Sequence, residues 1–188
     1  MTRLVLFTRY PEAGRAKTRL IPALGAEGAA RVHKVLTERT VALLPGAEVH
    51  FTGANADAFK GWLGDGFTYV EQPAGDLTDR LLAALDPAPV IFFGADTPDL
   101  CAAHVAAAIA ALETNEVVIG PAEDGGYYLI GVAKPLAALF TDMPWSTERV
   151  LPETLRRLAA MGIEPAILET LADCDRPEDV ARWPWLTL

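Results

Sequence analysis

The stretch PVIFFGADTPDLCAAHVAAAIAALET (89–114) contains one complete β–α unit, the building block from which the rest of the chain is made. Its first eight residues form a short apolar run that ends at Asp96, which predicts a buried strand and a turn. The alanine-rich segment 100–114 is long enough to be a helix rather than a strand.

Units of the same kind lie on both sides of this stretch, and no linker, repeat or low-complexity tract interrupts the 188 residues. The alternation predicts a mostly parallel sheet with helices on both faces, a three-layer α/β/α sandwich in one domain over 1–188, because parallel strands need crossover connections. The predicted strands are 3–8, 47–53, 67–72, 89–96, 116–121, 127–132 and 165–170, and the predicted helices are 26–44, 57–64, 76–86, 100–114 and 146–162.

Composition narrows the class of protein. A formal net charge of −9 argues against general nucleic-acid binding, which needs a basic face. No apolar run approaches the roughly 20 residues that span a bilayer, and the first apolar run is too short for a signal peptide. We therefore expect a soluble, cytoplasmic protein with no membrane span. Cys101 and Cys174 lack the spacing of a metal or disulfide framework and are expected to be reduced.

A cationic loop, RYPEAGRAKTRL (9–20), follows the first predicted strand. Ligands in such sheets bind beyond the carboxyl ends of the strands, so loops after strands are candidate sites. Gly14 lets the backbone approach a ligand closely, and Lys17 and Arg19 can donate charge-assisted hydrogen bonds to phosphate. The loop has neither the Walker A nor the G-x-G-x-x-G spacing. The alternative is a solvated surface loop, and in either case replacing Lys17 or Arg19 is expected to leave the fold intact.

The stretch FFGADTPDL (92–100) follows the fourth predicted strand. Thr97 and Pro98 are typical of a helix N-cap and the first helical position, which places Asp99 in the first turn as a stabilising charge. Asp96 then remains as a carboxylate directed into the crevice. A hard divalent cation held by one or two carboxylates and by substrate phosphates is the magnesium pattern, so Asp96 is the metal-ligand candidate.

Three further stretches each leave two interpretations open. Asp124 in PAEDGGYYLIG (121–131) lies on the expected ligand side, although Asp-Gly is also a strong hairpin signal. Asp173 and Asp175 near the C-terminus either contact metal or substrate or belong to a capped helical turn. Trp145 in PWST (144–147) either marks the start of a helix or stacks on a substrate.

The histidines and the single serine carry no catalytic pattern. His33 and His104 lie in predicted helices and His50 in a predicted strand, without paired spacing, so all three are interpreted as structural. Ser146 lacks the G-x-S-x-G context of a serine hydrolase.

The motifs resemble, in order and over nearly the whole chain, those of the radical-SAM/selenodomain-associated transferase family, some members of which are identified as arsenosugar-biosynthesis glycosyltransferases. That resemblance implies the GT-A fold of the nucleotide-diphospho-sugar transferases, with molybdenum-cofactor and phospholactate guanylyltransferases as distant relatives. The motifs are F-x-R-x-P-x-x-G-x-x-K-T-R-L (7–20), G-A-D-T-P-D-L (94–100), P-A-E-D-G-G-Y-Y-L-I-G (121–131), P-W-S-T (144–147) and D-C-D-R-P-E-D (173–179).

The resemblance also implies roles for individual residues. Asp96 stands where the GT-A metal-binding aspartate stands, and the residues of the nucleotide-diphosphate loop are Arg9, Gly14, Lys17, Thr18 and Arg19. The sequence departs from the family pattern at three positions: Arg9 replaces the commoner lysine, Thr78 occupies a glycine position, and Arg176 replaces the commoner threonine.

These observations predict a transferase that moves a sugar from a nucleotide-diphosphate donor to a small-molecule acceptor. The basic loop and Mg²⁺ or Mn²⁺ on Asp96 would stabilise the leaving diphosphate, while Asp124 would orient or deprotonate the acceptor hydroxyl. The alternative is nucleotidyl transfer from a nucleoside triphosphate with release of pyrophosphate. A non-catalytic nucleotide-binding protein is the third hypothesis. The donor base and sugar, the acceptor and the oligomeric state stay open.

Overall fold

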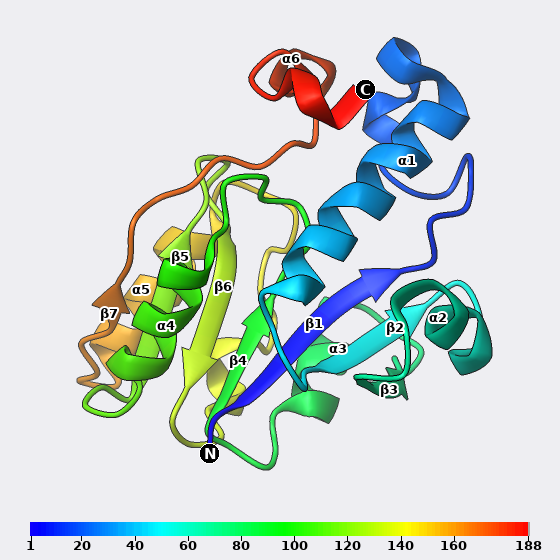
Figure 1. The fold of residues 1–188 in the computed structure, drawn as a ribbon. Helices are drawn as coiled ribbons and strands as arrows, with labels where there is room; N and C mark the ends of the chain where they lie inside the picture. The colour runs from blue at the N-terminus through cyan, green and yellow to red at the C-terminus, as the bar shows by residue number, and fades with distance from the viewer. Residues whose placement is uncertain (188) are drawn as a thin grey trace.

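The structure, a computed structural model, describes residues 1–187 and is built on a seven-stranded sheet (Figure 1). Its strand order is β3-β2-β1-β4-β6-β5-β7. The pairs β1–β2, β1–β4, β2–β3 and β5–β7 are parallel, and β6 is antiparallel to β4 and β5, so the mostly parallel sheet is confirmed. The strands are β1 (Arg3–Arg9), β2 (Glu48–Thr52), β3 (Thr68–Glu71), β4 (Val90–Phe93), β5 (Val117–Pro121), β6 (Tyr127–Val132) and β7 (Ala166–Ile167).

Helices cover both faces of the sheet, which confirms the three-layer α/β/α sandwich (Figure 1). Successive side chains of a strand point to opposite faces, so Leu6 and Phe93 enter one core and Val5 and Phe92 the other. The first core is covered by α1 (Ile21–Ala42), α2 (Ala56–Leu63) and α4 (Ala102–Ala111), and the second by α3 (Leu77–Ala84) and α5 (Val150–Ala160).

The C-terminal segment forms a third cluster with α1 and contains α6 (Pro177–Val180) and the short helix η3 (Pro184–Thr187). In Figure 1 it crosses from the β7 side of the sheet to α1. Its apolar contacts with the α1 region involve Leu20, Ala29, Val32, Leu36, Ala172, Cys174, Trp183 and Leu186. This packing brings residues 172–179 beside the loop that follows β1.

Several element boundaries differ from the sequence prediction. Helix α1 begins at Ile21, ahead of the predicted residue 26, because a separate turn precedes Gly25, whose φ of 69° interrupts the helical backbone. The predicted strand 165–170 shortens to Ala166–Ile167 at the sheet edge. Across residues 1–187, every helix is too short or too polar to cross a membrane.

Candidate active site

The cationic loop does not face solvent as a whole, so the alternative interpretation of residues 9–20 as a solvated surface loop is wrong for Lys17. Lys17 adopts the left-handed conformation (φ 45°, ψ 48°) immediately before the short helix η1 (Thr18–Leu20). Its side chain is only 3% exposed. The loop therefore turns inward beyond β1 and inserts one of its cations into the protein.

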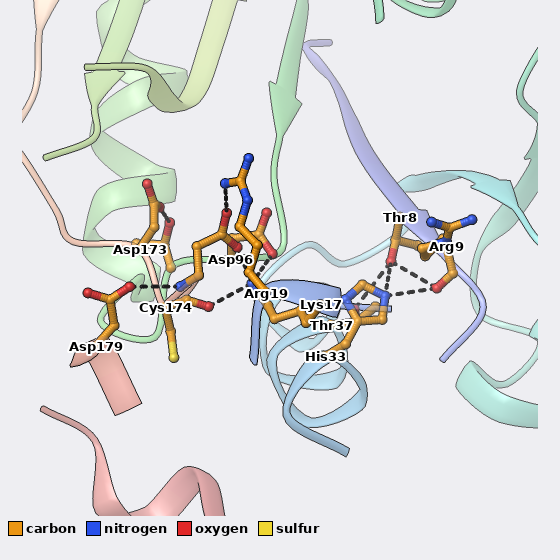
Figure 2. A network of polar contacts seen from close by, with 12 residues as sticks. Thr8, Arg9, Lys17, Arg19, His33, Thr37, Asp96, Asp173, Cys174 and Asp179 are labelled. Carbon is orange, nitrogen blue, oxygen red and sulfur yellow. Dashed lines mark hydrogen bonds and ion pairs between the residues drawn. The ribbon is translucent and has the colours of Figure 1, made fainter. Parts of the chain in front are cut away.

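The buried Lys17 ammonium joins three segments of the chain (Figure 2). Its Nζ lies 2.6 Å from Asp96 Oδ1 and 2.8 Å from Asp175 Oδ1, and it donates a hydrogen bond of 2.8 Å to the Cys174 carbonyl. The Cys174 N–H donates in turn to the Asp96 carbonyl at 2.9 Å. The loop after β1, the loop after β4 and the C-terminal segment thus meet at one cation.

The ion pairs set the protonation states of this cluster. Burial lowers the pKa of Lys17, but the charges of Asp96 and Asp175 outweigh it and the pKa lies above its ordinary value. Burial raises the pKa of Asp96, but the Lys17 ammonium overcomes this and the pKa lies below its ordinary value. Both groups are therefore charged near neutral pH.

The other predicted loop residues surround a small hollow. Arg9, Lys17, Thr18 and Arg19 line a cavity of about 180 Å³ together with Arg15 and Asp175. Arg19 donates to Asp175 Oδ2 at 3.2 Å, and its side chain is 59% exposed. Gly14 has a φ of 81°, and no other atom lies near the position of a Cβ there, so it supplies the turn rather than a close contact.

A buried polar network holds the end of β1 (Figure 2). His33 Nε2 lies 2.9 Å from the Arg9 carbonyl and 3.4 Å from Thr8 Oγ1, which in turn lies 3.2 Å from Thr37 Oγ1. Burial lowers the pKa of His33 below its ordinary value, which keeps the ring neutral near pH 7. His33 is structural, as predicted, and it positions the strand end from which the loop leaves.

The turn after β4 differs from the predicted helix start. Helix α4 begins at Ala102 with Cys101 as its N-cap, so the assignments of Thr97 as N-cap and of Asp99 to the first turn are wrong. The Thr97 hydroxyl donates to Asp173 Oδ1 at 2.9 Å, and the Trp183 indole N–H lies 3.0 Å from Asp99 Oδ1. Tertiary partners from the C-terminal segment replace the expected local capping.

Asp124 lies at the tip of the hairpin between β5 and β6. Its Oδ1 accepts a 2.8 Å hydrogen bond from the Gly126 N–H, and the Gly125 N–H donates to the Ala122 carbonyl. The two interpretations of this stretch therefore coexist: Asp124 stabilises the turn, and it also lines cavities of the cleft beside Asp173.

Asp173 is the residue whose importance is hardest to see from the sequence. Burial, together with the charges of Asp96, Asp124 and Asp175, raises its pKa to about 7, although the Thr97 hydrogen bond opposes the shift. Four carboxylates thus lie near enough to repel one another. In the sequence, Asp96 and Asp124 are indicated by their positions after predicted strands, whereas only the D-C-D spacing indicates Asp173 and Asp175.

The residues of the cleft supply oxygen donors, which suit a hard cation such as Mg²⁺ or Mn²⁺. Asp96 and Asp173 line the same cavity, and the Asp96 side chain is 49% exposed. Within residues 1–187, however, no group of three or more His, Cys, Asp or Glu side chains is arranged to hold a metal ion. The oxygen ligands in the cleft therefore suit such a cation. In this arrangement, however, the Lys17 ammonium occupies one face of the Asp96 carboxylate.

Two larger cavities extend the cleft. One, of about 250 Å³, is lined by Asp96 and Asp173 and by the aromatic residues Tyr127 and Trp145. The second, of about 730 Å³, is lined by charged residues of both signs, among them Arg19 and Asp124. Together with the basic hollow they adjoin one another beyond the carboxyl ends of β1 and β4, because Asp175 lines all three.

The chain belongs to the family described as "Uncharacterized protein conserved in bacteria (DUF2064)", whose model matches residues 33–147. No curated protein sequence matches the chain significantly.

Solved structures share the fold. A protein from Desulfovibrio desulfuricans G20, provisionally assigned as a nucleotide-diphospho-sugar transferase, is 27% identical with a TM-score of 0.88 and covers 97% of this chain and 87% of its own. A CMP:2-keto-3-deoxy-manno-octonic acid synthetase solved with CTP is 14% identical with a TM-score of 0.58, covering 98% and 97%. A manganese complex of Rv0371c from Mycobacterium tuberculosis H37Rv is 17% identical with a TM-score of 0.54, covering 96% of both chains.

The last two likenesses concern the fold alone. They share the nucleotide-diphospho-sugar transferase fold with the Desulfovibrio protein, and the likeness to that protein makes the chain an enzyme of the transferase class, as the sequence predicted. The chain is thus assigned to DUF2064 by its sequence and to this fold by its structure.

Proposed function

We propose that this protein is a metal-dependent glycosyltransferase that uses a nucleotide-diphosphate sugar as donor. The observation that carries the proposal is the contact between a cation-lined hollow and a carboxylate-lined cavity. The hollow contains Arg9 and Arg19, the cavity contains Asp96 and Asp173, and Asp175 lines both. A diphosphate bound with a divalent cation needs both kinds of wall next to each other.

The loop residues have distinct parts in this proposal. The exposed guanidinium groups of Arg9 and Arg19 bind phosphate oxygens, and Thr18 adds a hydroxyl at the same hollow. Gly14 allows the turn that brings them together. Lys17, already paired with Asp96 and Asp175, positions the carboxylates and stabilises charge that develops on the leaving diphosphate.

Asp96, with Asp173 beside it, would hold Mg²⁺ or Mn²⁺. When bound, the cation would neutralise charge on the diphosphate leaving group. Burial raises the pKa of Asp173, and the neighbouring carboxylates add to the shift; a cation between these carboxylates would relieve their repulsion, which supports this role. The manganese complex of Rv0371c, which has the same fold, is in keeping with such a site.

Asp124 is the proposed catalytic residue. Its carboxylate lines the same cavity as Asp96 and can orient an acceptor hydroxyl or take its proton. The hydrogen bond from the Gly126 N–H holds the carboxylate at the tip of the hairpin. This places the proposed base on a well-defined turn rather than on a free loop.

A thermal-shift panel tests the proposal with nucleoside diphosphates, nucleotide sugars and nucleoside triphosphates, each with and without Mn²⁺. A ligand at 100 times its Kd stabilises the fold by about 2.7 kcal/mol. We expect nucleotide sugars to stabilise the protein in a Mn²⁺-dependent manner and to be slowly hydrolysed. Stabilisation by nucleoside triphosphates with pyrophosphate release would instead favour the nucleotidyltransferase alternative, for which the synthetase solved with CTP is a fold-level precedent.

The finer expectations about family and location also stay predictions. These are the association with radical-SAM and selenodomain proteins, the arsenosugar assignment and the cytoplasmic location. We further propose that residues 1–188 make up a single GT-A-like domain, supported by a sheet that takes its strands from residues 3 to 167.

A further inference from the structure

The cavity of about 250 Å³ beside Asp96 is lined by side chains of two chemical kinds. One kind is the carboxylates of Asp96, Asp124, Asp173 and Asp175, and the other is the aromatic rings of Tyr127 and Trp145, which form an aromatic wall. Among the described residues 1–187, neither a lysine nor an arginine lines this cavity. It therefore differs from the hollow next to it, which is rich in cations.

A hydrogen-bonded pair holds the aromatic wall in place. The Trp145 indole N–H donates to Thr78 Oγ1 at 2.8 Å, and the Thr78 hydroxyl donates to the Phe140 carbonyl at 3.0 Å. Trp145 also meets Tyr127 edge to face, with 6.4 Å between the ring centroids. Thr78 lies in the first turn of α3, so a rigid element anchors the indole.

The segment that carries Trp145 has little other regular structure to hold it. Helix α5 begins only at Val150, so the predicted helix start at residue 146 is wrong. Ser146 has a φ of 61°, which is unfavourable for a residue other than glycine. The Thr78 hydrogen bond therefore adds a directional anchor to an indole that otherwise packs against the second core.

We infer that this cavity binds a neutral, polyhydroxylated ring and that Thr78 is the positioning residue for Trp145, the wall on which the ring packs. Aromatic side chains offer a flat apolar face, and carboxylates accept strong hydrogen bonds from hydroxyl groups. Such a ring is either the sugar of the donor or a sugar-like acceptor. The inference rests on the proposed function and deepens it.

The lining of the cavity favours a neutral ring over a phosphorylated one. Among the described residues no lysine or arginine lines it, so away from the carboxylates proposed to hold the metal a phosphate on the ring would find no cationic side chain for a charge-assisted hydrogen bond. The hydroxyl groups of a neutral ring can instead donate to the carboxylates. A sugar therefore suits this lining better than the phosphorylated acceptor that nucleotidyl transfer requires.

The experiment has two arms, both with Mn²⁺. The first compares UDP, GDP, ADP and dTDP with UDP-glucose, GDP-mannose, ADP-glucose and dTDP-glucose by calorimetry. The second adds glucose, mannose or glycerol, and then glucose 6-phosphate and mannose 6-phosphate, to the protein alone and to the protein saturated with a nucleoside diphosphate. If a nucleotide sugar binds more tightly than its nucleoside diphosphate in the first arm, the donor sugar is the occupant. If the neutral compounds bind in the second arm, the occupant is an acceptor.

Variants of Trp145 and Thr78 test whether the gain in affinity seen in either arm depends on the aromatic wall. Trp145→Ala should weaken the ring-dependent part of binding about five- to tenfold, and Thr78→Val about two- to fivefold, with binding of the nucleoside diphosphate unchanged. Thr78→Ser should retain binding. The double variant Trp145→Phe/Thr78→Val should bind the ring no more weakly than the weaker-binding of its two single variants. Either substitution alone already removes the hydrogen bond between the two side chains. Trp185→Ala is the matched control, since Trp185 lies on the C-terminal segment against Arg39.

The possible failures are distinguishable. If nucleoside diphosphates bind but neither attached sugars nor free neutral rings add affinity, the inference is overturned while nucleotide binding stands. Binding of the sugar phosphates in preference to the neutral rings, or a ring-dependent gain that is insensitive to Trp145→Ala and Thr78→Val, also overturns it. If no nucleotide or nucleotide sugar binds, the proposed function fails and the inference fails with it.

Discussion

The two charged sides of the cleft are built in opposite ways. The cations of the small hollow come from one continuous loop, residues 9–20, whereas the carboxylates of the neighbouring 250 Å³ cavity come from the turn after β4, the β5–β6 hairpin and the C-terminal segment. Lys17 belongs to both sides because its ammonium is paired with Asp96 and Asp175. A cluster of positive residues in a sequence is thus no measure of the positive charge available to a ligand, since the protein neutralises part of it.

The largest effect is expected at the residue that joins the two sides. Lys17→Ala should lower the free energy of unfolding by about 3 kcal/mol, because it leaves two carboxylates without their buried cation. Urea denaturation measures this. The control is Arg15→Ala, whose pair with Glu12 joins side chains 68% and 49% exposed and should change stability by less than about 0.5 kcal/mol. Equal stability of the two variants would show that Lys17 has no structural role.

Arg19 tests the part of the loop that remains available to a ligand. Arg19→Ala should weaken nucleoside-diphosphate binding by about 1.5–3 kcal/mol, the range for hydrogen bonds to charged groups. Its effect on stability should be small, since the side chain is 59% exposed. Isothermal titration calorimetry and a thermal melt separate the two quantities. Unchanged nucleotide affinity would remove Arg19 from the proposed site.

Asp96 and Asp99, the two carboxylates after β4, are expected to respond differently to the same substitution. Asp96→Asn should abolish the Mn²⁺-dependent part of nucleotide binding and, without metal, lower the free energy of unfolding by about 1 kcal/mol, because Lys17 loses one half-exposed partner. Asp99→Asn should retain the metal dependence and cost about 0.5–1 kcal/mol, because an amide oxygen still accepts from the Trp183 indole.

Thermal melts with and without Mn²⁺, in the presence of the nucleotide, measure both variants. Metal dependence that is retained in Asp96→Asn and lost in Asp99→Asn would reverse the assignment of these two residues.

The smallest expected effect concerns pH. In the folded protein the pKa of Asp173 is about 7, above its unfolded value, so the folded state binds more protons between about pH 4 and 7. Without metal, stability should therefore fall by about 1 kcal/mol as the pH rises through this window, after allowance for solvent screening. Asp173→Asn should remove that slope while retaining an oxygen acceptor for Thr97. Denaturation curves with EDTA at pH 5 and pH 8 measure it, and an unchanged slope in the variant would contradict the assignment.

Part of this arrangement could be predicted from the sequence because it depends on neighbouring residues. The alternation of apolar runs and helical periods determined the layered α/β fold, and the position of Asp96 just after a strand placed it at the carboxyl edge of the sheet. The same local reasoning failed at Thr97, where a hydrogen bond to Asp173, 76 residues away, replaces helix capping.

Only the tertiary structure decided which charges neutralise one another. The sequence determined that a basic loop follows β1 and that aspartates cluster near the C-terminus. The packing of Cys174 and Trp183 against α1 is what brings Asp175 to Lys17, across a separation of 158 residues. Local patterns determine strands and helices because periodicity acts between close neighbours, whereas an ion pair between distant residues exists only when the apolar contacts around it bring both ends of the chain together.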